Sequence, residues 1–600
     1  MATSRRWPAL AALLCTYLGV AATHAQTGSV SDAQRQYEQG AALLNQQNFA
    51  QAREHAARAV ALYEKDPHAD PLLLAASLDL LAACHAWLRE PESAEPLVLR
   101  ALKIRTDKLG EVHPHTIVSL QSAATMYASR GDGPRAIQYL QRAAAAQTQL
   151  TGYDSAEVYP FLPPLMALLE QHGPLQDLVN THQQHVAVME KARGKVSVEG
   201  AHARAAFGLV LKDAALLTDA ERELRLALNA LGMVQGEGSA DVAAVENNLA
   251  ETLRLQGRFQ DARPLHEHVL AAQRALTGQD SGPVARALNN LALLELNAGN
   301  HPRAETLFKQ SIAMWEKVEG PLAQDLAYPL NNLAELYRQR AQYADARPLY
   351  ERSLAIRTKA FGPSHPTTIT TVQNLALLAT EQGDMKTAEN LYQSALEALD
   401  TSNPLRATVL HNYAGFLRMR GLNHIALDMY QQVLTWQVGT LGREHPRVGD
   451  TLNSMALTQL ENDKPAMARP LLEVAISIAQ KTYGKDHAEV ALMRVNLADA
   501  LQRDGKPREA MALNQANLLI LEKQLGSGIP PLPRCTTTWV CRRSRRMTCR
   551  PRKPVSPRHW SCAALHWARI TGGWRRCWPT SSASAWRAGT SPGHWCWPRR

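Results

Sequence analysis

The chain has 600 residues, of which 45% are hydrophobic and 20% are charged, so it holds enough apolar side chains for a continuous core. Its formal net charge of +10 arises entirely after residue 526, because residues 1–526 contain 50 basic and 55 acidic residues. The body of the chain therefore lacks the excess of Lys and Arg that is typical of nucleic-acid-binding proteins, and we expect no nucleic-acid partner.

Residues 1–25 have the pattern of a secretory signal peptide. Arg5 and Arg6 precede an apolar run from Ala9 to Ala22, and Ala25 provides a small residue at the cleavage boundary. The run is too short for a comfortable membrane span, and no other stretch reaches the required length. We expect cleavage after Ala25, export, most simply to a bacterial periplasm, and a short linker over 26–32. The alternative is a buried first helix.

A unit of 42 residues recurs over residues 33–526. In the copy from Leu330 to Pro366, apolar residues follow the i, i+3, i+4, i+7 spacing of a helix in two stretches, which the polar turn from Gln339 to Gln342 separates. A helical hairpin of this kind cannot bury both apolar stripes alone, so it must stack on copies of itself.

One position in the second helix of each unit is small, which predicts that the two helices cross there too closely for a larger side chain. A shortened loop from Asp400 to Leu405 resets the count once, and the register predicts twelve hairpins. These anchor positions are Ala52, Ala94, Ala136, Leu178, Ala220, Ala262, Ala304, Ala346, Ala388, Ala426, Ala468 and Ala510.

The small, aromatic and Leu positions of this unit resemble the tetratricopeptide repeat. The 42-residue period, the Asn-Asn-Leu-Ala runs and the Leu-Gly-x-x-His-Pro loops, at Leu109 to Pro114 and Leu441 to Pro446, resemble its kinesin-light-chain variety. The resemblance weakens over residues 160–200, where prolines interrupt a first helix. It implies an all-α, right-handed superhelical solenoid of stacked helical hairpins that binds protein or peptide segments and catalyses nothing.

An asparagine recurs fourteen residues before most anchors from Ala262 onward. The resemblance implies that this line faces a concave groove and holds the backbone of an extended peptide, since an amide offers both a donor and an acceptor. The alternative is that the line only bridges adjacent repeats or satisfies local backbone. We place the groove between Ala244 and Leu501. Its expected residues are Asn248, Asn290, Asn332, Asn374, Asn412 and Asn496, flanked by Asn247, Asn289 and Asn331, with Arg254, Arg286 and Arg338.

Four histidines recur in the loops that precede first helices, namely His113, His365, His445 and His487. A repeat width separates neighbouring loops, so we predict helix-start capping and no shared metal ion. The sequence has no H-E-x-x-H motif, no phosphate-binding Gly loop and no nucleophile elbow, and we expect neither an enzyme nor a cofactor. Cys84, the single cysteine from Gln26 to Gly526, is predicted to be a core residue and not a reactive thiol.

Residues 527–600 differ abruptly, with fifteen Lys and Arg, no acidic residue and six of the eight cysteines. Read literally, this is a basic tail for nucleic acid or an anionic membrane. However, Trp has a single codon, so in the frame one base earlier Trp567 followed by Ala568 must encode Gly, where the period requires Gly. The pairs His559-Trp560, His566-Trp567 and Cys577-Trp578 must each encode Leu at apolar repeat positions. We predict that residues 527–600 are an out-of-frame tail. The alternative to a scaffold is therefore a sensing arm whose C-terminal effector enzyme was lost by the frameshift.

Sequencing the gene around Gly526 and Gly528 tests this interpretation. Restoring one base there should extend the 42-residue register through at least one further hairpin. A verified nucleotide sequence in which no frame continues the repeat would contradict the frameshift and make the basic tail a real element.

Overall fold

The computed structural model describes residues 31–401 and 403–525, so the predicted signal peptide, most of the linker and the predicted out-of-frame tail lie outside the described residues. The described ranges contain 24 α-helices and two short 3₁₀ helices, with no β-strand among them. Consecutive helices pack pairwise, and the all-α solenoid of stacked helical hairpins that the repeat predicts is confirmed.

Each pair consists of a first helix and a second helix. The first helices are α2 (Asp32–Asn45), α4 (Pro71–Trp87), α6 (Pro114–Ser129), α8 (Leu162–His172), α10 (Val198–Asp213), α12 (Ala240–Leu255), α14 (Gly282–Asn297), α16 (Ala327–Gln339), α18 (Pro366–Gln382), α20 (Leu405–Met419), α22 (Pro446–Glu461) and α24 (Ala488–Arg503). The second helices are α3 (Phe49–Lys65), α5 (Pro91–Leu109), α7 (Gly133–Thr151), α9 (Leu175–Arg193), α11 (Leu217–Gln235), α13 (Phe259–Thr277), α15 (His301–Val318), α17 (Tyr343–Phe361), α19 (Met385–Glu397), α21 (Asn423–Leu441), α23 (Pro465–Tyr483) and α25 (Pro507–Leu525).

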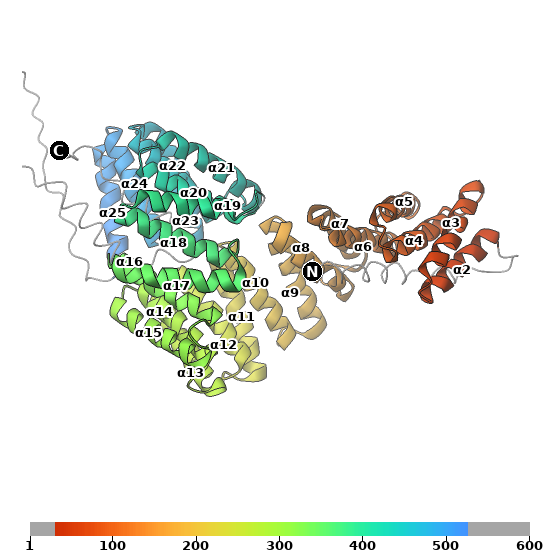
Figure 1. Ribbon diagram of the computed structural model, residues 1–600, viewed down its shortest axis with the longest axis horizontal. Helices are drawn as coiled ribbons and strands as arrows, with labels where there is room; N and C mark the ends of the chain where they lie inside the picture. The colour runs from red at the N-terminus through yellow and green to blue at the C-terminus, as the bar shows by residue number, and fades with distance from the viewer. Residues whose placement is uncertain (1–30, 402, 526–600) are drawn as a thin grey trace, which may run out of the picture. The chain divides into compact units, whose positions relative to one another are not determined.

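The chain divides into two compact units, residues 1–210 and residues 211–600, with the division inside α10. In the first unit the hairpins α2–α3, α4–α5 and α6–α7 stack in chain order, as Figure 1 shows in red and orange. In the second unit α12 to α25 continue the same pattern, so one packing rule builds both units.

The anchor alanines lie where the two helices of a hairpin cross. A Cβ atom added to Gly40 of α2 would lie 3.3 Å from both the carbonyl oxygen of Ala52 and the backbone nitrogen of Ala56 in α3. The first helix therefore needs a small residue opposite the anchor as well, and a buried alanine recurs there from Ala250 onward. These alanines are Ala250, Ala292, Ala334, Ala376, Ala414, Ala456 and Ala498.

The loop histidines cap the helices that follow them. His113, His365, His445 and His487 are the N-caps of α6, α18, α22 and α24, and each ring accepts a hydrogen bond from the backbone N–H two residues on. The Nδ1 to N distances are 3.1–3.3 Å. The predicted capping role is confirmed. Cys84 is fully buried among the core residues of α4, as predicted.

The pair α8–α9 departs from the regular hairpin. Pro160 lies in the 3₁₀ helix η3 (Ala156–Phe161), and Pro163 and Pro164 lie in the first turn of α8, where a missing N–H is tolerated. The prolines thus split the first helix and leave α8 only 11 residues long. Leu178 replaces the anchor alanine of this pair and remains buried.

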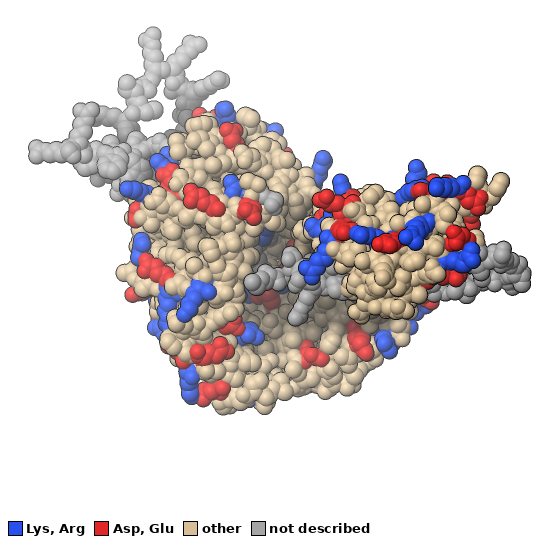
Figure 2. Space-filling view, turned by 45° about the vertical axis from the view of Figure 1, so that its right-hand side comes forward, with Lys and Arg blue, Asp and Glu red and all other residues tan. Residues whose placement is uncertain are grey.

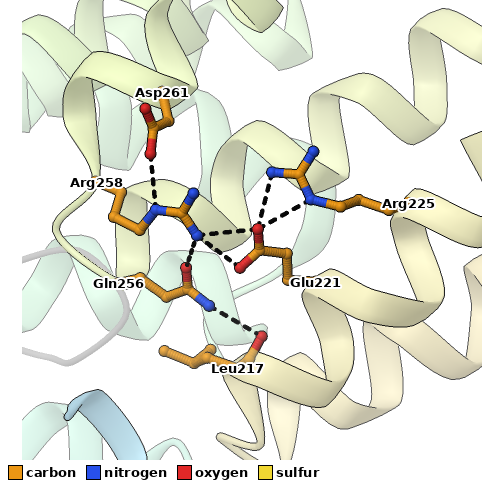
Figure 3. A network of polar contacts seen from close by, with 6 residues as sticks. All are labelled: Leu217, Glu221, Arg225, Gln256, Arg258 and Asp261. Atoms are coloured by element: carbon orange, nitrogen blue, oxygen red, sulfur yellow. Dashed lines mark hydrogen bonds and ion pairs between the residues drawn. The ribbon is translucent and has the colours of Figure 1, made fainter.

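Ion pairs on the outer side tie each hairpin to the next. Glu221, directly after the anchor Ala220, accepts hydrogen bonds from Arg225 at 2.8 Å and from Arg258 of the next hairpin at 2.8 Å (Figure 3). Gln256 donates to the Leu217 carbonyl oxygen at 3.2 Å. Burial alone would raise the pKa of Glu221, but the bonds from Arg225, Gln256 and Arg258 lower it. The acid at the same register position repeats the contact in the pairs Glu95–Arg130, Glu305–Arg340 and Glu389–Arg420.

Within the second unit, helix ends far apart in sequence meet at a seam. The Nε2 atom of neutral His445 donates to the carbonyl oxygen of Asp213 at 3.4 Å, and the ring of His487 bonds the carbonyl of Leu255. Burial lowers the pKa of both histidines to about 4, which keeps each ring neutral and able to cap and donate at once. The ends of α10 and α12 therefore contact the starts of α22 and α24.

The anchor predicts a local stability effect. Ala346→Leu adds three carbon atoms at the crossing of α16 and α17, where Ala346 is fully buried. We expect a loss of about 1–3 kcal/mol in unfolding free energy from overpacking. Ala355→Leu, on the exposed side of the same helix, is the matched control and should unfold like the wild type in urea. Equal midpoints for both variants would contradict the crossing.

The half-buried carboxyl of Asp450, on α22 near the seam, should make the free energy of unfolding depend on pH. Burial raises the pKa of Asp450 to about 7, although Arg447 opposes the shift, so the folded chain holds a proton that the unfolded chain releases near pH 4. This carboxyl therefore reduces stability as pH rises from about 4 to 7. Asp450→Asn should gain about 1–2 kcal/mol over wild type across that window, because a half-buried group realises only part of the shift.

Urea unfolding of both proteins at pH 4.5, 6 and 7.5 measures this gain. The outer-surface variant Asp345→Asn is the control and should follow the wild type at every pH. A difference between Asp450→Asn and wild type that does not change with pH would contradict the raised pKa.

Candidate functional site

The first helices line the inner side of the stack in the second unit. Successive first helices touch one another from α14 through α24, and successive second helices are in weaker contact. A stack whose first helices approach more closely than its second helices curves toward the first helices. The surface that the first helices present is therefore the inner face, and the predicted asparagines lie on these helices.

The asparagines form a ladder of hydrogen bonds along the inner face. Five of them donate an amide N–H to a residue on the preceding first helix, which lies 43 positions earlier in four cases and 39 positions earlier for Asn412, after the shortened loop. The bonds are Asn290 to Asn247 at 2.9 Å, Asn332 to Asn289 at 2.8 Å, Asn374 to Asn331 at 3.0 Å, Asn496 to Asn453 at 2.9 Å, and Asn412 to Gln373. The structure thus brings the predicted line and its flanking asparagines together, and Asn248 begins the line on α12.

The ladder bonds leave part of each amide available. The bond of Asn332 uses one of its two N–H donors, and among the described residues its carbonyl oxygen has no hydrogen-bond partner. Asn248, Asn290, Asn332 and Asn496 are half-buried, whereas Asn374 and the flanking Asn289 and Asn331 are buried. The ladder bridges repeats, as the alternative interpretation holds, and its half-buried members also keep groups for a ligand. Groove binding by this line stays a prediction.

A second line on the inner face was missed by the sequence reasoning, apart from its member Arg286. It lies four residues before each asparagine, one helical turn away, and consists of the exposed residues Ala244, Arg286, Tyr328 and Thr370. The Arg286 guanidinium is 2.7 Å from the Asp325 carboxylate, and the Tyr328 ring lies over Arg357, whose guanidinium carbon is 5.0 Å from its centroid. The signal was the same 42-residue period, but these residues vary in type and so formed no motif.

The three predicted arginines occupy different depths. Arg286 is exposed, so a ligand on the inner face can reach it. Arg338 is fully enclosed, with Glu335 at 2.7 Å on its own helix and Glu381 of α18 on its other side. Burial alone would lower the pKa of Arg338, but these two carboxylates raise it. Arg254 is similarly buried beside Glu251. Arg254 and Arg338 thus lie beneath the inner face.

Basic and acidic side chains are interspersed on the surface of the described helices. On the face that Figure 2 shows, blue and red side chains of the described helices lie next to one another in both units. In the described part of the chain, no group of three or more His, Cys, Asp and Glu is arranged to hold a metal ion. The helices of residues 31–401 and 403–525 include none with the length and apolarity that a bilayer crossing needs.

Known proteins share this repeat. One curated relative, the mitochondrial tetratricopeptide repeat protein 19 of Homo sapiens, is 27% identical over 128 residues, which are 21% of this chain and 33% of that protein. The chain thus matches about a third of that relative's length. A crystal structure of Podosopora anserina putative kinesin light chain nearly identical TPR-like repeats is 27% identical over 32% of this chain and 94% of its own, with a TM-score of 0.27. A Rap protein complexed with competence and sporulation factor is 16% identical over 58% and 92%, with a TM-score of 0.35.

A family model gives the family itself. The model described as tetratricopeptide repeat matches four segments, residues 72–149, 241–317, 325–401 and 405–481, which together exceed half of the chain. The matched segments contain eight of the eleven anchor alanines and the asparagine ladder from Asn247 to Asn412. The chain belongs to the tetratricopeptide repeat family.

Proposed function

We propose that this protein is a non-enzymatic scaffold that binds an extended peptide or protein segment along the inner face of the second unit, from α12 to α20. Proteins of the tetratricopeptide repeat family in general bind other proteins. The observation that carries the proposal is the asparagine ladder, because it places half-buried amides at one level on successive first helices.

A peptide in extended conformation presents N–H and C=O groups along its whole length, and most of them must find partners when it is bound. A half-buried side-chain amide can donate to and accept from such a backbone, as Asn332 can after its ladder bond. The ladder also fixes the amide orientations before binding, which lowers the entropy cost of ordering them.

The exposed line beside the ladder supplies contacts that depend on the sequence of the bound segment. Tyr328 is 41% exposed and offers an aromatic ring, the kind of side chain that contributes most at interfaces. Arg286 adds a cation whose partner Asp325 is itself partly exposed. We therefore expect a bound segment to be selected by a few side chains at α14 and α16, and to be held elsewhere through its backbone.

Export through a signal peptide cleaved after Ala25 is part of this proposal, and it rests on the sequence pattern of residues 1–25. The alternative, a sensing arm whose effector enzyme was lost, depends on the frameshift that the sequence predicts after residue 526. We propose the scaffold because the asparagine ladder runs along the inner face from α12 to α20, within the repeats themselves.

A displayed library of random peptides, selected on the full chain, tests the proposal. The affinity of selected peptides, measured by fluorescence anisotropy, should fall at least about tenfold in the double variant Arg286→Ala with Tyr328→Ala, a loss of about 1.4 kcal/mol or more. Both side chains are exposed, so helical content and unfolding midpoint should change little.

The matched control removes one cation and one apolar side chain from second helices, by Lys359→Ala with Met385→Ala, both exposed residues. Peptide affinity should be unchanged in this control. Peptides that lose affinity only in the control, or in neither variant, would place binding elsewhere and overturn the proposal.

A further inference from the structure

A buried arginine occupies the same position in alternate hairpins of the second unit. Arg254 of α12, Arg338 of α16 and Arg418 of α20 are each less than 5% exposed. The hairpins between them carry Leu296 and Thr380 at this position, which are also buried. Enclosed guanidinium groups require carboxylates and hydrogen-bond acceptors around them, because an unpaired buried charge is very costly.

In two of the three cases the next first helix supplies a carboxylate. Glu381 lies 43 residues after Arg338 and Glu461 lies 43 residues after Arg418, and each forms an ion pair with its arginine. The second helix of the hairpin adds a tyrosine at a fixed place: Tyr350 donates to Glu335 at 2.9 Å beside Arg338. Each set therefore combines an arginine, a carboxylate from the next repeat and a tyrosine hydroxyl.

The set around Arg254 has other residues in place of the next-repeat carboxylate and the tyrosine. Asn297 stands 43 residues after Arg254, in the place of Glu381 and Glu461, and His266 stands in the place of Tyr350. Asn297 is 1% exposed and His266 is 2% exposed. Both polar atoms of each side chain lack a hydrogen-bond partner among the described residues. A buried polar group that is left without a partner loses its hydration without compensation.

The charge around this set also differs. Lys212, one period before Arg254, joins Arg254 in attracting the half-buried carboxylate of Glu251. The other acid near Lys212 is Asp213, which is 75% exposed and 3.9 Å away. Burial lowers the pKa of His266 to about 4, so its ring is neutral at pH 7. Lys212 and Arg254 thus both attract Glu251, whereas Arg338 pairs with both Glu335 and Glu381.

We propose that the Arg254 set, made of Lys212, Glu251, Arg254, His266 and Asn297, binds the carboxylate group of a ligand. The ligand carboxylate takes the position that Glu381 and Glu461 occupy in the sister sets, and accepts hydrogen bonds from the Asn297 amide and the His266 ring. The guanidinium of Arg254 then bridges Glu251 and the ligand, as Arg338 bridges Glu335 and Glu381. Lys212, with 20% of its side chain exposed, connects the set to solvent.

Histidine NMR on the wild-type full chain gives the direct readout. With ¹³C-labelled histidine, and a His266→Gln sample to assign the signal, the pKa of His266 should rise from about 4 when acetate replaces chloride at equal ionic strength, because a neighbouring carboxylate favours the charged ring. The unfolding temperature should rise by about 2 °C or more in acetate and not in chloride. Sulfate at equal ionic strength tests anions other than carboxylates.

Two variants exchange the residue at the position of the next-repeat carboxylate between the Arg254 set and the Arg338 set. Asn297→Glu supplies the carboxylate from the chain itself, as in the sister sets, and should raise the unfolding temperature in chloride while abolishing the response to acetate. Glu381→Asn removes the carboxylate of the next repeat from Arg338, with Tyr350 still in place, and should acquire an acetate response. Helical content by circular dichroism shows that each variant is folded, and the NMR readout stands without either of them.

A peptide arm separates the two sources of a carboxylate. Acetylated and amidated Ala-Ala-Glu-Ala-Ala is compared with its Gln counterpart. Responses to both acetate and the Glu peptide assign the set to carboxylates in general, and a response to the Glu peptide alone assigns it to a side chain of a protein partner. No shift of His266 with either probe, or equal responses to the Glu and Gln peptides without one to acetate, would overturn the proposal and leave buried water as the partner of Asn297.

Discussion

The close crossing of two helices at the anchor alanine determines most of this structure. Backbone atoms of α3 lie 3.3 Å from a Cβ atom added to Gly40, so the hairpin has little freedom in how its helices approach. Because eleven of the twelve hairpins share the anchor alanine, these hairpins present similar surfaces to their neighbours. The solenoid is then a sum of nearly identical interfaces, in which stability accumulates from repeat to repeat.

Because the helices cross in the same way in successive hairpins, residues at one position of the repeat form a line along one face of the stack. One asparagine per repeat becomes the ladder from Asn247 to Asn496, and one arginine per two repeats becomes a row of buried charged sets. Both features cost solvation free energy that packed apolar residues would not. Their regular placement connects them with the inner face, where a partner segment and a ligand carboxylate are the contacts we propose.

The sequence alone predicted the repeat, the anchors and the capping role of His365, because these depend on local spacing. It did not distinguish the depth of Arg338 from that of Arg286, because the two arginines occupy positions ten residues apart in the repeat and only the packing of neighbouring helices shows which of them is enclosed. It named Asn247, Asn289 and Asn331 as flanking residues but did not predict that each would accept a hydrogen bond from the asparagine 43 residues later. The contact of His445 with Asp213 could not be predicted, because it depends on a small rotation accumulated over several repeats.

Photo-crosslinking within one hairpin tests the central claim that partners lie along the inner face. A benzoylphenylalanine residue replaces either Thr370, exposed on the first helix α18, or Lys386, exposed on the second helix α19, in the full chain made by its native host. The account predicts that irradiation links a protein partner to the Thr370 position and not to the Lys386 position. Crosslinks from Lys386 alone would contradict it.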